Sequence, residues 1–401
     1  MEDSGASNIF LYLLLLAALA SGWWLGRRSS KSGGSYFGLG SNKPPTNDYF
    51  IGLNYLLNDE PDDAIDIFIE SLEINSNTLE THLALGTLLR RRGKVDRSIT
   101  LYQDLLGKSI FSRSELNEIK ISLVQSYISA GLLDRAEHLL KELRNEKGSI
   151  KVQALVLSAN VYQLEKDWQE GVDALLELLK VCSSGKRSTY QNLASHFYCE
   201  MAEEELENEH MSRARDFLLS AVSLDKNNAR VSILLGRLES QCGNYKEAIT
   251  NYLRVKKQNA SFMADVFTPL VECYQQAGKE KELRNFIDES IQGESGTSFL
   301  LELAKYLERE RGQEDARKYL VQQLGSKSSL RLMLQTLALD DVSDSILEDK
   351  HLFLKVLKEN IEGKAQYQCT NCGFEMKSLM WHCPSCSQWG NVKHVMGVSG
   401  E

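Results

Sequence analysis

The sequence predicts an all-α protein in which a superhelical solenoid of helix pairs stands between an N-terminal transmembrane helix and a small C-terminal metal-binding domain. Three observations predict this fold: an uncharged apolar run near the N-terminus, a repeat of 34 residues in the middle, and two Cys-x-x-Cys pairs near the C-terminus. The 401 residues carry a formal net charge of −9. This charge argues against nucleic acid as a partner.

The apolar run covers residues 9–25 and contains no charged side chain. A helix of this length extends about 25 Å, which is just enough to span a bilayer. Two acidic residues precede the run, whereas Arg27, Arg28 and Lys31 follow it. Because positive flanks stay on the cytoplasmic side, we expect an anchor over residues 8–26 with the N-terminus outside and the rest of the chain in the cytosol. A cleaved signal peptide is the alternative, but its positive charge would come first.

Residues 27–45 are rich in Gly, Ser and Pro and show no apolar period, which predicts a flexible tether. From residue 46 to residue 361 the chain is rich in helix formers and has no convincing alternating strand pattern. A set of small and large residues recurs there after 34 residues: Gly52, Tyr55, Ala64 and Phe68 return as Gly86, Leu89, Ser98 and Tyr102. This is the period of a tetratricopeptide repeat.

Further repeats follow the same pattern, around Tyr127, Tyr162, Ala214, Gly236, Tyr274 and Ala304. We expect about eight helix pairs over residues 46–326, followed by capping or linking helices over residues 327–361. The small residues let the two helices of a pair approach closely, so these positions are interpreted as packing. Stacked pairs form a superhelix whose concave face typically holds a peptide or a partner domain.

The C-terminal segment, residues 364–398, contains the candidate metal ligands Cys369, Cys372, Cys383 and Cys386. Two Cys-x-x-Cys pairs separated by ten residues can close on one tetrahedral metal ion. Gly373 supplies the positive φ that such a turn needs, whereas Ser387 stands at the matching place after the second pair, where we expect strain or a different shape. Surface disulfides or unused thiols are the alternative.

Zinc and iron both accept four thiolates, so the spacing leaves the metal open. A structural role is the first interpretation, because a segment of about 35 residues is too small to fold on its own core. A redox role is the rival, although the chain shows no flavin, nicotinamide or quinone site. A zinc ribbon that reads nucleic acid is disfavoured, because the strong bases of the segment are Lys364, Lys377 and Lys393 alone.

No phosphate-binding loop, GxSxG elbow, HExxH helix or kinase signature occurs in the sequence, and we expect no enzymatic activity. His196 near Cys199 is interpreted as a packed or surface histidine of a repeat helix. The remaining thiols are expected to be small apolar core residues in a reducing compartment: Cys182, Cys199, Cys242 and Cys273. The basic triplet at residues 90–92 is interpreted as a solvated helix face, with anionic lipid or an acidic partner as the alternative.

This combination of segments resembles the lipopolysaccharide assembly protein B family of Gram-negative bacteria. The stretches that carry the resemblance are GWWLGRRS, DYFIGLNYLLNDEPDDAIDIF, HLALGTLLRRRGKVDRSI, HFYCEMA, NNARVSILLGRL, CYQQAGK, YQCTNCGF and WHCPSC. They run from the membrane segment to the C-terminal cysteines. The region from residue 327 to residue 361 matches least.

The resemblance implies a rubredoxin-type metal domain packed against the repeats, with the four cysteines as ligands and iron as the favoured metal. It implies a regulator of lipopolysaccharide synthesis in the inner membrane, with its N-terminus periplasmic. Such a regulator acts with the membrane-anchored AAA+ zinc protease to promote degradation of the lipid A pathway deacetylase. An inner-membrane lipopolysaccharide sensor and later lipopolysaccharide assembly enzymes are further implied partners. Two rivals stay open: a rubredoxin-like electron carrier or redox sensor, and a general scaffold for membrane enzymes.

Overall fold

The computed structural model describes residues 73–293, 296–325, 329–339, 364–395 and 397, and also the single positions Tyr55, Ile65, Ile67, Ile69, Lys355 and Lys358. The expected anchor at residues 8–26 and tether at residues 27–45 lie outside the described residues, as does most of the first expected repeat. No helix within the described part of the chain is long and apolar enough to cross a membrane. The anchor therefore stays a prediction.

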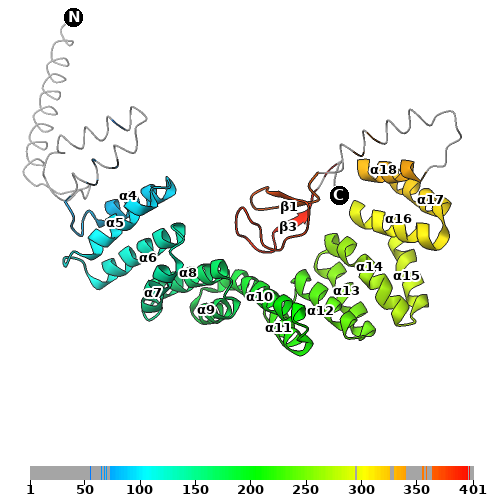
Figure 1. The fold of residues 1–401 in the computed structure, drawn as a ribbon, viewed down its shortest axis with the longest axis horizontal. Helices are drawn as coiled ribbons and strands as arrows, with labels where there is room; N and C mark the ends of the chain where they lie inside the picture. Colours follow the sequence, from blue (N-terminus) through cyan, green and yellow to red (C-terminus); the bar gives the residue numbers. More distant parts are fainter. Residues whose placement is uncertain are drawn as a thin grey trace, which may run out of the picture.

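The described helices follow one another in pairs that form an arc (Figure 1). The pairs are α4 (Leu79–Arg91) with α5 (Val95–Leu106), α6 (Arg113–Ser129) with α7 (Leu133–Leu143), α8 (Ser149–Glu165) with α9 (Trp168–Val181), α10 (Ser184–Glu207) with α11 (Met211–Leu224), α12 (Ala229–Gln241) with α13 (Tyr245–Gln258), α14 (Met263–Gln276) with α15 (Glu280–Gln292), and α16 (Thr297–Arg311) with α17 (Gln313–Leu324). A short 3-10 helix, η1 (Ala260–Phe262), precedes α14, and α18 (Leu330–Ala338) follows α17. The helical solenoid predicted from the repeat is confirmed.

The repeated glycine and tyrosine explain how a pair closes. Gly236 on α12 lies so near Tyr252 on α13 that a Cβ on the glycine would stand 2.5 Å from a ring carbon. Gly86 and Tyr102 repeat this contact between α4 and α5, where the corresponding distance is 2.4 Å. Both tyrosine rings are buried. In these two pairs the repeated residues therefore form a packing contact between the two helices.

Residues 364–395 form a separate unit, the metal knob. Its strands β1 (Tyr367–Cys369), β2 (Glu375–Met376) and β3 (Val392–His394) make an antiparallel sheet in the order β2-β1-β3. Tyr367 pairs with Met376 on one side and with His394 on the other. The buried residues of its own core are few: Tyr367, Cys369, Met376, Cys383 and Val392. Such a core is too small to stabilise a fold without a disulfide bond or a bound metal ion.

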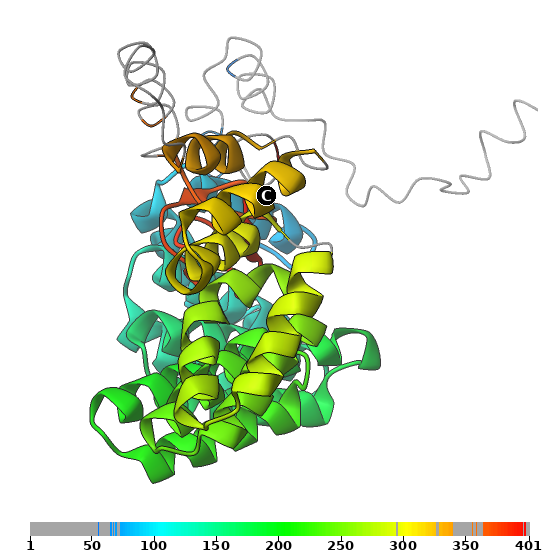
Figure 2. The same ribbon diagram turned by 90° about the vertical axis from the view of Figure 1, so that its right-hand side faces the viewer.

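The metal knob lies on the inner side of the arc. Figure 1 shows β1 and β3 above the middle of the solenoid, and the view turned by 90° in Figure 2 agrees with this placement. Its contacts come chiefly from α8, α10, α12 and α14, which are the first helices of four successive pairs. The concave face that a solenoid typically offers to a partner is thus partly covered by the chain's own C-terminal unit.

Candidate metal centre

The structure brings the four predicted ligand thiols together. Their Sγ atoms all lie within 4.8 Å of one another. The Sγ atoms of Cys369 and Cys386 are 3.7 Å apart, and those of Cys372 and Cys383 are 3.6 Å apart. A tetrahedral ion with metal–sulfur bonds of about 2.3 Å requires sulfur atoms about 3.8 Å apart. The donor set therefore fits one ion, and four thiolates suit either zinc or iron.

Two similar turns hold the two cysteine pairs. In the first turn the Gly373 N–H donates to the Cys369 carbonyl at 2.9 Å, and in the second the Ser387 N–H donates to the Cys383 carbonyl at the same distance. Gly373 has φ +78° and Ser387 has φ +54°, so both residues are left-handed. A serine side chain is disfavoured there. The sequence predicted strain or a different shape at this serine, and the structure shows the same left-handed turn as at Gly373.

The four thiols differ in their surroundings. Cys369 and Cys383 are buried, Cys386 is half-buried and Cys372 is exposed. A hydrogen bond from the Asn371 side chain lowers the pKa of Cys386 to about 6, whereas burial raises the pKa of Cys383 to about 11. Since a metal binds the thiolate, Cys386 is prepared for ligation and Cys383 must release a proton when a metal binds.

Trp389 connects the metal knob to the solenoid. Its Nε1–H donates to Oε1 of Gln163 on α8 at 2.9 Å, and the Gln163 Nε2 lies 3.1 Å from the His382 ring. The Trp389 ring stacks on His196 of α10 with centroids 5.3 Å apart, and it meets Phe197 edge-on at 6.0 Å. Aromatic pairs with these separations contribute energy beyond their buried area. The contact therefore fixes the knob in position and orientation.

His196 is 1% exposed and serves this contact. It lies between Trp389 and Trp381, whose ring centroid is 6.3 Å away. Burial, with a smaller effect from the Arg230 charge, lowers its pKa to about 3, so the imidazole is neutral at ordinary pH. Gly390 approaches so closely that a Cβ there would stand 3.0 Å from His196 Nε2. His196 is thus a packed histidine, as the sequence predicted.

Arg230 on α12 is 3% exposed and lies over the Trp389 ring. Its guanidinium carbon is 5.7 Å from the Trp389 ring centroid. It forms ion pairs with Glu200, at 2.7 Å, and with Glu203, both on α10. A buried guanidinium needs such partners because desolvation of an unpaired charge is costly. The Trp389 contact consequently rests on a charge network that joins two helix pairs.

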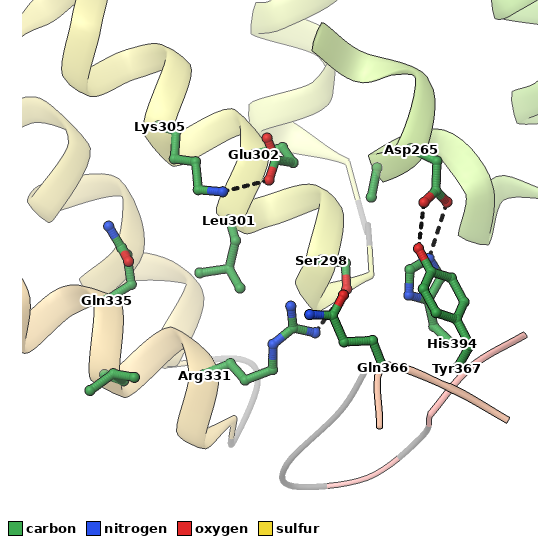
Figure 3. Close-up of a pocket in the computed structure, with 12 residues that line it drawn as sticks. Asp265, Ser298, Leu301, Glu302, Lys305, Arg331, Gln335, Gln366, Tyr367 and His394 are labelled. Carbon is green, nitrogen blue, oxygen red and sulfur yellow. Dashed lines mark hydrogen bonds and ion pairs between the residues drawn. The ribbon is translucent and has the colours of Figure 1, made fainter. Parts of the chain in front are cut away.

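A second contact lies at the sheet. The Tyr367 hydroxyl donates to Asp265 Oδ1 at 2.6 Å, and His394 Nε2 is 3.3 Å from Asp265 Oδ2 (Figure 3). Nearby, Trp381 packs on Phe262 of η1 with ring centroids 4.9 Å apart. One carboxylate at the start of α14 therefore holds both β1 and β3. The knob is attached to the solenoid at two places, through Trp389 and through the sheet.

Beside Asp265 a cavity of about 260 Å³ separates the knob from α16 and α18 (Figure 3). Arg331 of α18 donates from Nη1 to Ser298 Oγ at 2.9 Å across this cavity, and Lys305 pairs with Glu302 at 2.7 Å. The first of these contacts joins α18 to α16, and the second lies within α16. The cavity belongs to the attachment of the knob.

Comparison with known proteins agrees with these features. The family described as "Rubredoxin metal binding domain" matches residues 367–393. "Lipopolysaccharide assembly protein B" of Escherichia coli strain K12 is 33% identical over 97% of this chain and 99% of its own. The protein of the same name from Haemophilus influenzae is 32% identical over 96% of this chain and 98% of its own. The chain belongs to the lipopolysaccharide assembly protein B family.

Among solved structures, a tetratricopeptide repeat protein from Parabacteroides merdae covers 66% of this chain and 99% of its own, with 11% identity and a TM-score of 0.34. A TM-score of 0.34 is too low for this similarity to support any statement about the shape of the arc. Membership of the lipopolysaccharide assembly protein B family, which the sequence motifs indicated, is confirmed over nearly the whole chain.

Within this family member, the residues that attach the knob were not singled out from the sequence, except for His196. Gln163, Asp265 and Arg230 belong to polar or charged residue types that are usually exposed on repeat helices. One signal was present in the sequence: both Trp381 and Trp389 lie in a segment of about 35 residues, which is too short for a large core of its own. A segment that cannot bury two tryptophans in its own core must place them against another surface.

Proposed function

We propose that this protein is an adaptor for lipopolysaccharide synthesis that has no catalysis of its own. It presents the lipid A pathway deacetylase to a membrane-anchored AAA+ zinc protease and so promotes degradation of the deacetylase. The observation that carries the proposal is the relationship over 97% of the chain to proteins named lipopolysaccharide assembly protein B. An arc of helix pairs supports it, because such solenoids typically act by holding other proteins.

The proposed location is the inner membrane, with a single pass over residues 8–26, a periplasmic N-terminus and the bulk of the chain in the cytoplasm. Anchoring beside a membrane protease raises the effective concentration of a bound client there, without any new contact. A lipopolysaccharide sensor in the same membrane acts as antagonist in this proposal. Later lipopolysaccharide assembly enzymes are further clients of the scaffold.

The role proposed for the metal, iron or zinc, is structural. When bound, the ion supplies the folding free energy of the knob through its four thiolates. The docked knob then covers part of the concave face, where Trp389 and His382 contact Gln163 of α8, so the inner surface of the arc contains residues of both units. A redox role would require the metal's oxidation state to change the activity of the protein.

The test uses the full-length protein, solubilised in detergent from its own membranes. We expect the protease and the deacetylase among the co-purified proteins, and a longer deacetylase half-life after depletion of the adaptor. A chain lacking residues 1–28 should fold but fail to restore turnover. Normal turnover with that truncation would contradict membrane anchoring. Absence of the protease together with an unchanged half-life would overturn the adaptor proposal and favour a general scaffold.

A further inference from the structure

A groove of about 780 Å³ lies between the solenoid and the metal knob. One wall comes from α8, α10 and the turn between α11 and α12. The other wall comes from the second cysteine turn of the knob, from Cys386 to Asn391. The volume is in the range of sites that bind ligands, roughly 300–1,000 Å³. Neither the repeats nor the knob could form this groove alone.

The groove is almost free of charge. Of the sixteen residues that line it, Asp225 is the charged one apart from the metal-binding thiol, whereas 25% of the whole chain is charged. The Asp225 carboxylate already accepts hydrogen bonds from the Asn192 side chain at 2.8 Å and from the Asn227 backbone at 2.9 Å. No Lys, Arg or His is among the lining residues. A phosphate-bearing ligand would find no cation there to pair with.

Side-chain amides give the groove its polar character. Asn160 on α8, Asn227 in the turn, and Gln388 and Asn391 on the knob all line it. In the described part of the chain, none of these four side chains hydrogen-bonds to another residue. An amide both donates and accepts hydrogen bonds, as does every peptide unit of an extended chain. The two walls therefore offer matched partners to a polypeptide backbone that lies between them.

The aromatic side chain in the wall is not available for stacking. Trp389 is 8% exposed, because His196 covers its ring on one side and the Arg230 guanidinium lies over it. Sugars and nucleic acid bases are commonly held against an open ring. No residue that lines the groove offers such an open aromatic ring. Apolar side chains such as Val156 and Leu193 instead provide contacts for small uncharged side chains.

We propose that this groove binds an extended, uncharged segment of a partner polypeptide. The Asn160 and Gln388 side chains, on opposite walls, form hydrogen bonds with the backbone of that segment. The proposal rests on the adaptor function, since an adaptor needs a site for its client. A bound metal ion has a structural effect on this site, because its ligand Cys386 belongs to the turn that carries Gln388 and Asn391. Loss of the metal removes one wall of the groove.

The first experiment places photo-reactive p-benzoylphenylalanine at Asn160, and separately at Gln388, in the full-length protein in its own cells. The matched control position is Leu219, which is 54% exposed on α11. That helix lies on the outer side of the arc (Figure 1). We expect both groove positions to crosslink to one short segment of one protein, without Lys, Arg, Asp or Glu, and the control not to. Separate or charged segments, a glycan or lipid adduct, or no adduct would overturn the proposal.

The second experiment measures binding of a labelled synthetic peptide with the crosslinked sequence to the full-length protein in detergent. Asn160→Ala and Gln388→Ala should each weaken binding about fivefold, as expected for one lost hydrogen bond. Leu219→Ala should leave binding unchanged, and all variants should retain metal and melting temperature. Unchanged binding in both groove variants would refute the proposal. If the segment belongs to neither the deacetylase nor the protease, the groove assignment stands and the adaptor's client is wrong.

Discussion

Trp389 of the metal knob donates its indole N–H to Oε1 of Gln163 on α8, at 2.9 Å and across 226 residues of sequence. The same glutamine reaches His382 with its amide nitrogen. Both polar ends of Gln163 are thus used by the knob. Because of this specific contact, the knob is part of the inner surface of the solenoid. A substitution in either unit at the contact should therefore affect the other unit.

Trp389→Ala should release the knob from the arc. The change removes the stacking on His196, the contact with Phe197 and the hydrogen bond to Gln163. Loss of a buried tryptophan typically lowers the free energy of unfolding by about 3–5 kcal/mol. Hydrogen exchange of residues 364–395 should rise strongly. Phe374→Ala, at an exposed aromatic residue of the knob, is the control and should leave exchange unchanged.

Asp265→Ala should weaken the second attachment. The carboxylate accepts from the Tyr367 hydroxyl and contacts His394, and hydrogen bonds to a charged group contribute about 1.5–3 kcal/mol each. We expect a loss of about 2–3 kcal/mol in chemical denaturation. Asp288→Ala removes an exposed carboxylate that pairs with Arg311 at 3.4 Å, and should change stability by less than about 0.5 kcal/mol. Equal effects of the two variants would show that Asp265 does not anchor the sheet.

Replacing Cys369 and Cys372 by Ser should abolish metal binding and unfold the knob, because thiolate ligation supplies its folding free energy. Metal analysis and hydrogen exchange would show the loss, and solubility and turnover of the deacetylase should fall together. Cys242 is exposed, so the expectation that it lies in the core was wrong, and Cys242→Ser should retain both metal and activity. A stable and active double variant would show that the metal is dispensable.

Gly236→Ala should destabilise the solenoid. The new Cβ would stand 2.5 Å from the buried Tyr252 ring, and overpacking of this kind costs about 1–3 kcal/mol. Gly185 on α10 is the matched control, because a Cβ there meets nothing within 4 Å. Its replacement by Ala should stabilise the helix by up to about 1 kcal/mol. Thermal melts of the two variants should therefore move in opposite directions.

His196 should make stability depend on pH. Its pKa is lowered to about 3 in the folded protein, so the unfolded chain binds the extra proton between pH 6.5 and 3. Stability is complete above pH 6.5 and falls as the pH drops toward 3, by about 1 kcal/mol at pH 5.5. Denaturation at pH 7.5 and 5.5 should show this loss, and His196→Phe should reduce it by that amount. His138→Phe, at an exposed histidine of α7, should not.

Local sequence patterns predicted much of this structure. The recurrence of Gly86 with Tyr102 and of Gly236 with Tyr252 predicted helix pairs, and in the structure each glycine packs closely against its tyrosine on the other helix of the pair. The spacing of the cysteines predicted which thiols meet, because each Cys-x-x-Cys turn presents two sulfurs on one side. The position of Ser387 after the second pair predicted strain or a different shape, and its backbone is left-handed. In each case the residues involved are close in sequence or related by a fixed period.

The sequence by itself thus determined the repeated helix pairs and the cluster of four thiols, through contacts whose partners lie within one repeat or one pair of turns. Only the tertiary structure decided where the knob docks, that Gln163 and Asp265 hold it, and that an amide-lined groove arises between the two units. The physical reason is that these contacts depend on the curvature of the whole arc. That curvature sums small rotations from one helix pair to the next, and no local pattern encodes it.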